Sequence, residues 1–180
     1  YSSAASMCIR DRMIETLRLK IFPLKYTELL KYKDSKNKLE EQFGLKKSKW
    51  KHSEEVIEMF EKRMLPRFEK DKRNYLFNSV WLIIDKKQNV IVGDFGIKGR
   101  PVMNEGKNEI EIGYGTRTEY LNKGYMTEAI GGFVKWISER KDVDIIIAET
   151  EKNNIASIKV LEKNGFVIYK ETKTVGCWKK

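Results

Sequence analysis

The hydrophobic period of this chain changes from two residues to 3.6 residues near its middle. Residues 109–115 alternate isoleucine or tyrosine with glutamate or glycine, which is typical of a β-strand with two different faces. Apolar residues in 126–137 then recur at helical spacing, which predicts a helix that ends by about Arg140. Gly131 and Gly132 inside this helix are expected to allow close packing against a sheet. The switch of period favours an α/β fold.

Three apolar segments that precede the switch are expected to be strands. The runs 80–84 and 90–97 flank the polar turn 85–89, and together they predict a β-hairpin. Alternation of apolar and polar residues over 17–23 suits a first strand, which ends at a proline. The centre of the chain is therefore expected to be antiparallel sheet.

Two helices are expected between the first strand and this hairpin. Thr27 could cap a helix that runs to about Tyr32, and a lysine-rich linker follows. Ser53, followed by two glutamates, has the form of an N-cap with acidic first-turn residues. The apolar spacing after it predicts a second helix, which stops or kinks near Pro66.

Strands and helices alternate in the last third of the chain. The near-continuous apolar run 143–148 is typical of a strand covered on both faces. A helix is expected over 154–164, with Gly165 ending it, and another strand begins within 166–169. The predicted fold class is thus a mixed α/β fold, with a mostly antiparallel central sheet flanked by helices.

The length of 180 residues suits one domain, because a second full domain would leave both cores marginal. That domain is expected over 13–180, and residues 1–12, which lack a clear period, are interpreted as an extension or an expression remnant. The apolar runs are too short to cross a bilayer, and the start does not resemble a signal peptide. A cytoplasmic protein without membrane association is expected.

Charge and cysteine content narrow the classes of partner. Cys8 and Cys177 form neither a disulfide framework nor a zinc-binding spacing, so no metal is expected. The net charge of +10 favours an anionic partner. Because the lysines are spread along the chain without interleaved aromatic residues, a solvated basic surface is favoured over direct nucleic-acid binding.

The segment 120–129 carries the strongest chemical signal. It joins the strand 109–115 to a helix start, where backbone N–H groups lack partners and phosphate oxygens bind readily. Gly124 would allow close approach of a phosphate, Asn122 tolerates a left-handed turn and Lys123 adds a positive charge. The same residues also occur in plain turns, but no P-loop or dinucleotide-binding glycine pattern is present.

Three motifs in a fixed order give the sequence its resemblance to a known family. They are Glu111-Ile112-Gly113-Tyr114 on a strand, Asn122-Lys123-Gly124-Tyr125-Met126-Thr127-Glu128-Ala129 at a helix start, and Asn154-x-x-Ser157 followed by Leu161-Glu162-Lys163-Asn164-Gly165-Phe166. From about Thr16 to Trp178 the chain resembles the GCN5-related N-acetyltransferases (the GNAT superfamily), particularly their Rim-type branch. It departs from the usual loop pattern at Leu121 and Met126, where the family has arginine or glutamine and a small residue.

The resemblance implies the site of the cosubstrate, acetyl-CoA. In the family the sheet splays between its fourth and fifth strands, here 109–115 and 143–149, and the pantetheine arm pairs with the opened backbone. The loop 122–127 binds the pyrophosphate, and a backbone N–H within 114–116 polarises the thioester carbonyl. The cosubstrate-binding residues implied in this way are Tyr114, Gly115, Asn122, Lys123, Gly124, Tyr125, Met126, Thr127, Asn154 and Ser157.

The proton chemistry is assigned to Glu111 and Ser157. Acyl transfer needs a neutral amine, a polarised carbonyl and a proton for the leaving thiolate. Glu111 resembles the family glutamate that deprotonates the amine, directly or through water; Glu109 shares its face, and both could be plain strand residues. Ser157 is expected near the CoA sulfur, and Asn154 contacts pantetheine or caps its helix. His52 lies far from these motifs in sequence, so a histidine base has little support.

The function implied by the resemblance is acetyl transfer from acetyl-CoA to a primary amine by direct attack in a ternary complex. The amine belongs to a protein N-terminus or a small molecule, and the segments 31–77 and 99–108 are expected to bind it. A non-catalytic acyl-CoA sensor and a basic RNA-associated accessory protein remain as alternatives. The glutamate, asparagine and serine named above favour the enzyme.

The tail after Phe166 is short for the last two strands of that family. Two interpretations follow: the segment 176–180 is truncated, or a partner chain completes it. A homodimer is therefore among the expected assemblies.

Overall fold

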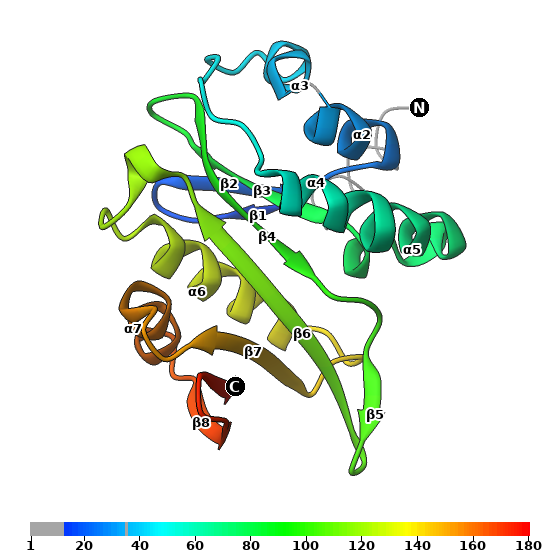
Figure 1. Cartoon of the computed structure of the whole chain (residues 1–180), viewed down its shortest axis with the longest axis vertical. Coiled ribbons are helices and arrows are strands. Elements are labelled where there is room, and N and C mark those ends of the chain that lie inside the picture. The colour runs from blue at the N-terminus through cyan, green and yellow to red at the C-terminus, as the bar shows by residue number, and fades with distance from the viewer. Residues whose placement is uncertain (1–12, 35) are drawn as a thin grey trace.

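The computed structural model describes residues 13–34 and 36–180, and the strands in this part of the chain form one open sheet (Figure 1). They are β1 (Ile14–Glu15), β2 (Leu19–Pro23), β3 (Val80–Asp85), β4 (Val90–Ile97), β5 (Val102–Asn104), β6 (Lys107–Thr116), β7 (Ile145–Glu151), β8 (Val167–Glu171) and β9 (Val175–Lys179). The order is β1-β2-β3-β4-β6-β7-β9-β8, and β5 pairs with β6. All of these pairs are antiparallel except β6 with β7. The predicted mixed, mostly antiparallel sheet is confirmed.

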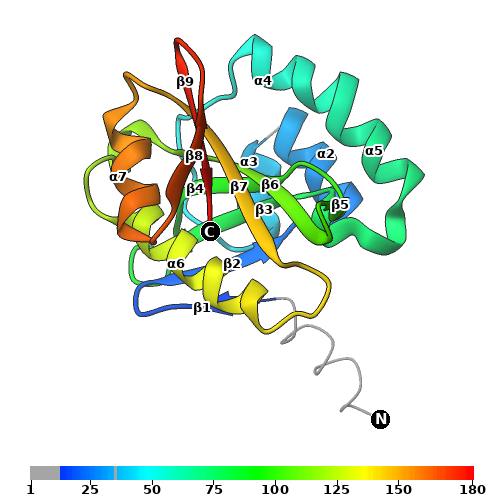
Figure 2. The ribbon, with the colours of Figure 1, turned by 90° about the horizontal axis from the view of Figure 1, so that it is seen from below.

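Helices cover both faces of this sheet (Figure 2). One face carries α2 (Tyr26–Asp34), α3 (Lys36–Gln42), α4 (Glu54–Met59), the π-helix η1 (Phe60–Met64) and α5 (Leu65–Lys70). The other face carries α6 (Tyr125–Ser138) and α7 (Ile155–Lys163). Two 3₁₀ turns, η2 (Lys72–Phe77) and η3 (Thr118–Tyr120), connect elements. The predicted extension 1–12 lies outside the described residues.

The strand β3 and the first half of β4 are buried on both faces of the sheet. Trp81 and Ile83 pack toward α6, whereas Leu82 and Ile84 pack toward α2 to α5. The run 143–148 was predicted to be a strand covered on both faces, and this prediction was wrong. In β7 only alternate residues are buried, because the helices α2 to α5 cover β3 and β4 and do not extend over β7.

The helix α6 packs closely on the sheet edge at Gly132, as predicted, whereas Gly131 faces α7 and not the sheet. A Cβ atom at Gly132 would lie 2.7 Å from Thr16 Cγ2 and 3.1 Å from Ile14 Cγ2. A Cβ atom at Gly131 would lie 2.9 Å from Asn164 Oδ1 at the end of α7. Gly132 therefore allows close contact with β1, and Gly131 allows close contact with α7.

Helix starts and ends follow the capping residues where these are present. The side chain of Ser53 accepts a hydrogen bond from the Val56 N–H, so the predicted N-cap of α4 is confirmed. Gly165 has φ +73° after α7, in agreement with its predicted role. The chain stays helical through Pro66, because the π-helical turn η1 precedes the proline and places it at the start of α5.

Three predictions for the first fifty residues were wrong. Thr27 does not cap α2, because the helix begins at Tyr26 and contains Thr27. Leu17 does not belong to the first strand; it is 90% exposed in the turn between β1 and β2, and the buried alternation begins at Leu19. The predicted lysine-rich linker contains α3, whose Leu39 is buried in the core under α2. Tertiary burial of that leucine stabilises a helix that its lysine-rich sequence did not indicate.

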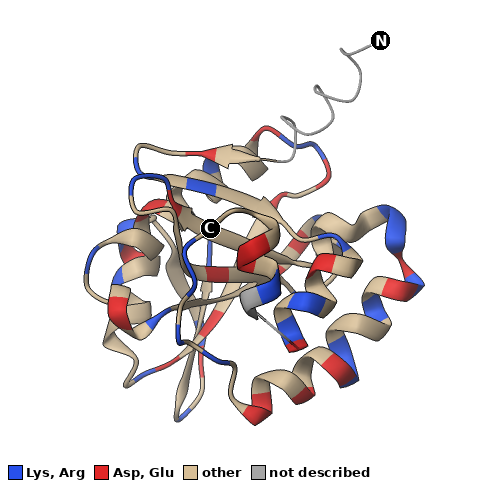
Figure 3. Ribbon diagram, turned by 90° about the horizontal axis from the view of Figure 1, so that it is seen from above, with Lys and Arg blue, Asp and Glu red and all other residues tan. Residues whose placement is uncertain are grey.

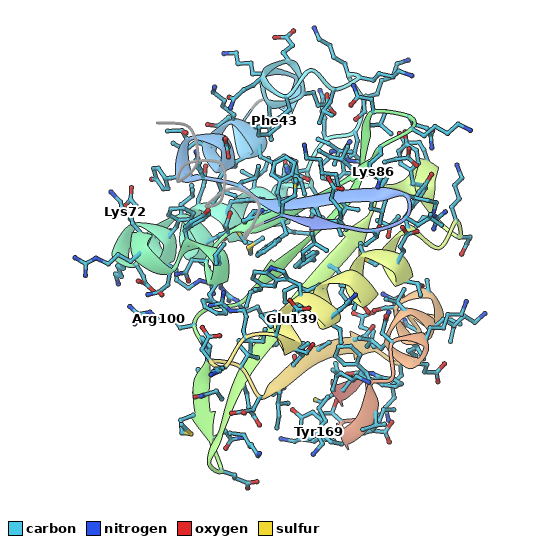
Figure 4. The ribbon with its side chains drawn as sticks, turned by 180° about the vertical axis from the view of Figure 1, so that it is seen from behind. Phe43, Lys72, Lys86, Arg100, Glu139 and Tyr169 are labelled. Atoms are coloured by element: carbon cyan, nitrogen blue, oxygen red, sulfur yellow. The ribbon has the colours of Figure 1, made fainter. Side chains whose placement is uncertain are left out.

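The segment 176–180, predicted to be truncated or completed by a partner chain, lies in and just after β9, which pairs with β7 and β8 of the same chain. Residues 172–174 reverse the chain, and the Thr172 N–H donates to the Val175 carbonyl at 2.8 Å. This tight turn lets two strands of five residues each form within the tail after Phe166. Tyr169 lies on β8 at the sheet edge, 44% exposed (Figure 4).

Basic and acidic residues are interspersed over the helices seen in Figure 3. Among the described residues, the helices include none that is long and apolar enough to cross a membrane. Within the same residues, the structure has no group of three or more His, Cys, Asp and Glu side chains that could hold a metal ion.

Candidate functional site

The parallel strands β6 and β7 separate at their carboxyl ends. They pair only where Glu109 to Ile112 faces Ile145 to Ala148. Beyond these residues β6 continues to Thr116 along β4, and β7 continues to Glu151 along β9. The facing edges of the two strands are therefore open, so the predicted splay, between the fourth and fifth strands of the family, lies between β6 and β7.

The turn before α6 adopts the left-handed backbone that its residues favour. Asn122 has φ 58° and Gly124 has φ +75°. Gly124 is the N-cap of α6 and supplies no side chain, so the first N–H groups of the helix receive no side-chain cap. The ammonium of Lys123 donates to the Glu119 carbonyl at 2.8 Å, beside the Tyr120 ring. The first N–H groups of α6 therefore remain available as hydrogen-bond donors.

A side-chain clamp, formed by Arg18 and Glu128, holds this turn against the first hairpin. The Glu128 carboxylate accepts hydrogen bonds from Thr16 Oγ1 at 2.6 Å and from Arg18 Nε at 2.6 Å. Arg18 Nη1 also donates to the Lys123 carbonyl at 3.0 Å. The acid in the first turn of α6 is thus neutralised, and the loop is pre-organised.

Two of the predicted loop residues point their side chains into the protein. The Tyr125 hydroxyl donates to Asp85 Oδ2 at 2.7 Å. Met126 is buried beside Gly93, where a Cβ atom would lie 3.3 Å from its terminal methyl carbon. Tyr125 and Met126 can therefore offer a ligand only their backbone groups, and the departure from a small residue at Met126 is accommodated by a glycine on β4.

The start of α7 meets β6 across the open part of the sheet. Asn154 caps α7, because its side-chain oxygen accepts a hydrogen bond from the Ser157 N–H at 3.0 Å. Ser157 Oγ lies 2.9 Å from the Tyr114 hydroxyl, which also donates to the Ser157 carbonyl at 3.2 Å. Burial raises the pKa of the Tyr114 phenol. The structure thus joins two predicted residues in a contact that the sequence did not indicate.

A cavity of about 630 Å³ lies on the opposite face of β6, under α4, η1 and α5. Its floor includes Gly96 on β4 with Gly113 and Gly115 on β6, which are neighbours in the sheet. A Cβ atom at Gly115 would meet no atom within 4 Å. The floor therefore exposes backbone to whatever occupies the cavity. The acidic and basic side chains lining it are His52, Arg63, Arg67, Asp94, Lys98, Glu111 and Arg117.

Of the two predicted glutamates, Glu111 lines the cavity. It is half-buried and pairs with the ammonium of Lys98, which lies opposite it on the neighbouring chain segment. Glu109, two residues earlier, accepts a hydrogen bond from the Asn104 amide at 3.0 Å in the β5–β6 hairpin. The two glutamates, which share a face of the strand, therefore have different surroundings.

His52 is far from Glu111 in the sequence but close to it in the structure. It lines the same cavity as Glu111, because the loop before α4 folds back over the sheet. Its ring packs edge-on against Tyr32, Trp50 and Phe60, with centroid separations of 4.7, 4.5 and 5.2 Å. Distance along the chain was a poor guide here, because three aromatic contacts draw the loop to the site.

Asp94 and Arg67 are further cavity residues that the sequence analysis missed. Asp94 Oδ2 accepts a hydrogen bond from the Tyr32 hydroxyl at 2.6 Å, and burial raises the pKa of its carboxyl group. An acidic residue inside the apolar run 90–97 was the available signal for it. Arg67 lies on α5 and donates to the Ile97 carbonyl at 3.4 Å. Arg63 and Arg67 are four residues apart and so lie on the same face of a helix, which was the available signal for Arg67.

Arg117 anchors the far wall of the cavity. Its guanidinium donates to the Ile91 carbonyl at 2.8 Å and lies 3.5 Å from the Glu40 carboxylate. Glu40 Oε2 accepts the Ser48 N–H at 3.1 Å, and the Trp50 ring lies over the guanidinium at 4.9 Å. This buried pair ties α3 and the following loop to the end of β6.

A family model described as an acetyltransferase (GNAT) domain matches residues 19–167. The protein of Bacillus subtilis (strain 168) described as an uncharacterized N-acetyltransferase, YjdG, is 39% identical over 88 residues. That match spans 49% of this chain and 51% of the YjdG protein, about half the length of each.

Solved structures with the same fold cover nearly all of the chain. The ribosomal-protein-S5-alanine acetyltransferase of Vibrio fischeri has a TM-score of 0.66 at 20% identity, covering 93% of this chain and 95% of its own. A RimL ribosomal L7/L12 α-N-protein acetyltransferase in complex with coenzyme A has a TM-score of 0.66 at 15% identity, covering 94% and 97%. An acetyltransferase of Salmonella typhimurium that modifies the N-terminal serine of L7/L12 has a TM-score of 0.64 at 16% identity, covering 94% and 98%.

Proposed function

Because this chain belongs to the GNAT acetyltransferase family, we propose that it transfers an acetyl group from acetyl-CoA to a primary amine. The observation that carries the proposal is the opening between β6 and β7. The helix α6, which follows β6 along the chain, lies on one face of the sheet. The cavity lined by Glu111 lies on the opposite face, beyond the opening between β6 and β7. Such an opening can hold a thioester between a phosphate-binding turn and an acceptor site.

The residues present fit acetyl-CoA as cosubstrate. The uncapped N–H groups at the start of α6 suit the pyrophosphate, and the open edges of β6 and β7 suit the amides of pantetheine. The fold is shared with a RimL structure in complex with coenzyme A, which supports this placement. Asn122, Lys123, Gly124 and Thr127 would act near the phosphates, with Tyr125 and Met126 contributing backbone N–H groups.

Glu111 accepts the proton that the acceptor's ammonium must lose before attack, directly or through water. The amine then forms a C–N bond to the acetyl carbon, and the C–S bond breaks. A backbone N–H within 114–116 stabilises the charge that develops on the carbonyl oxygen. Ser157 supplies a proton to the leaving thiolate and is reprotonated by the second proton that the nitrogen loses as the amide forms. Tyr114 orients the Ser157 hydroxyl through the 2.9 Å contact.

The acceptor is proposed to be a protein N-terminus or a small-molecule amine. The first source is supported by two proteins of the same fold, the RimL L7/L12 α-N-protein acetyltransferase and the Salmonella typhimurium acetyltransferase that modifies the N-terminal serine of L7/L12. A panel of peptides with free N-termini, polyamines and aminoglycosides, incubated with acetyl-CoA and read by mass spectrometry, tests the proposal. A gain of one acetyl group on an acceptor supports it. Binding of acetyl-CoA without transfer to any amine would favour the sensor instead.

Gly124→Pro is expected to weaken CoA binding by roughly 10- to 100-fold, the usual worth of a charge-assisted hydrogen bond. Proline removes the Gly124 N–H and imposes a negative φ where the backbone has +75°. Calorimetric titration with CoA measures the change. Gly44→Pro is the matched control, because Gly44 has φ +64° and no atom within 4 Å of its Cβ position. Equal CoA affinity in wild type and Gly124→Pro would make this turn a structural one.

A further inference from the structure

Arg67 is a cavity cation without an acidic partner among the described residues. Its Nε is buried and has no hydrogen-bond partner there, and its one hydrogen bond, to the Ile97 carbonyl, is long at 3.4 Å. Burial lowers the pKa of its guanidinium. Withdrawing a cation from water is unfavourable unless an anion or several acceptors compensate it. Arg67 therefore has unused capacity to bind an anion.

Two other cations of the cavity, Lys98 and Arg117, differ from Arg67 because each faces a carboxylate. Lys98 pairs with Glu111, and Arg117 faces Glu40. Arg63, four residues before Arg67, lines the same cavity and likewise has no carboxylate partner within the described part of the chain. The wall formed by η1 and α5 thus presents two guanidinium groups whose charge no protein carboxylate neutralises.

Arg67 contacts the strand segment that pairs with the segment carrying Glu111, the proposed base. Ile97, whose carbonyl it contacts, pairs with Ile112, and the next N–H, of Lys98, donates to the Glu111 carbonyl at 2.8 Å. An anion on Arg67 would thus lie close to an amine placed at Glu111. The phosphates of acetyl-CoA are an unsuitable source for this anion, because α6 and α5 lie on opposite faces of the sheet (Figure 2).

We propose that the acceptor carries a carboxylate, which Arg67 binds while the acceptor's amine lies at Glu111. This inference rests on the proposed acetyltransferase function. A guanidinium forms two parallel hydrogen bonds with a carboxylate, a geometry that an ammonium does not reproduce. Two sources share this chemistry: a free amino acid, and a peptide with an acidic residue next to its N-terminus.

Matched acceptors test the proposal and separate these sources. A peptide amide beginning serine-aspartate is compared with one beginning serine-asparagine, and free serine is compared with serine amide. Within each pair kcat/KM is corrected for the fraction of neutral amine, because the carboxylate also changes the amine's pKa. The wild type is expected to prefer the carboxylate member of at least one pair by about 10- to 100-fold.

Arg67→Gln keeps the length and polarity of the side chain but removes its charge, so that preference should fall to about 1- to 3-fold, mainly through KM. Lys70→Gln removes an exposed charge at the end of the same helix and should keep the full preference. A wild-type preference near one in both pairs would overturn the proposal. So would an undiminished preference in Arg67→Gln. Acetylation of all four acceptors at equal rates would refute recognition of an acceptor carboxylate by Arg67 but would still support the transferase function.

Discussion

Replacing Glu111 with glutamine is expected to lower kcat/KM for acetylation of an amine by about 10²–10⁴. Glutamine keeps the shape and hydrogen bonding of the side chain but cannot accept the proton. CoA affinity, measured by calorimetry, should barely change, because the proposed phosphate contacts lie at α6. The deficit should shrink as the pH rises toward the pKa of the acceptor, about 7.7–8.0 for a peptide N-terminus. Above that range the free amine forms without an enzyme base.

Glu109→Gln is the matched control, because Glu109 lies on the same strand and is bonded to Asn104. It should retain activity within about 3-fold, since a surface hydrogen bond contributes little. A Glu111→Gln enzyme with the wild-type rate and pH profile would contradict the assignment. The base would then be Asp94, His52 or water, and Glu111 would serve as the partner of Lys98.

Arg117→Met is expected to lower the free energy of unfolding by about 3–5 kcal/mol. Arg117 and Glu40 face each other at 3.5 Å, and their side chains are 1% and 0% exposed. Methionine fills a similar volume but leaves the Glu40 carboxylate buried without its cation. For a chain of this length the loss corresponds to a fall in Tm of roughly 6–20 °C in a calorimetric scan.

A second substitution separates charge from packing. Adding Glu40→Gln to Arg117→Met removes the uncompensated carboxylate, so the double variant should regain part of the lost stability. Lys62→Met breaks an exposed pair with Glu58 at (i, i+4) and should cost only about 0.3–0.5 kcal/mol. If Arg117→Met lowers the free energy of unfolding no more than Lys62→Met does, the buried ion pair stabilises the protein no more than a surface ion pair.

Several elements were predictable because their signals are local. The hairpin of β3 and β4, the helix α6 and the caps of α4 and α7 follow from period, turn residues and capping side chains. The loop at Gly124 is predictable for the same reason, since its left-handed backbone suits glycine. The role of this loop as a phosphate site came from the resemblance and remains a proposal.

Elements stabilised by distant contacts were predicted poorly. The helix α3 forms where Leu39 reaches a core built by other segments, and Leu17 leaves the first strand for a turn. The strand β7 looked fully buried, yet only one of its faces is covered. In each case the deciding neighbour lies far along the chain, where a local pattern carries no information about it.

The sequence by itself determined the order of β3, β4, β6, α6, β7, α7 and β8, the turn at Asn122 to Gly124, and the presence of Glu111 and Ser157 on a strand and a helix start. Only the tertiary structure decided what surrounds them: Tyr114 against Ser157, Lys98 against Glu111, and His52, Asp94 and Arg67 around one cavity. The physical reason is that period and capping act within a few residues, whereas a site forms where the sheet brings distant segments together.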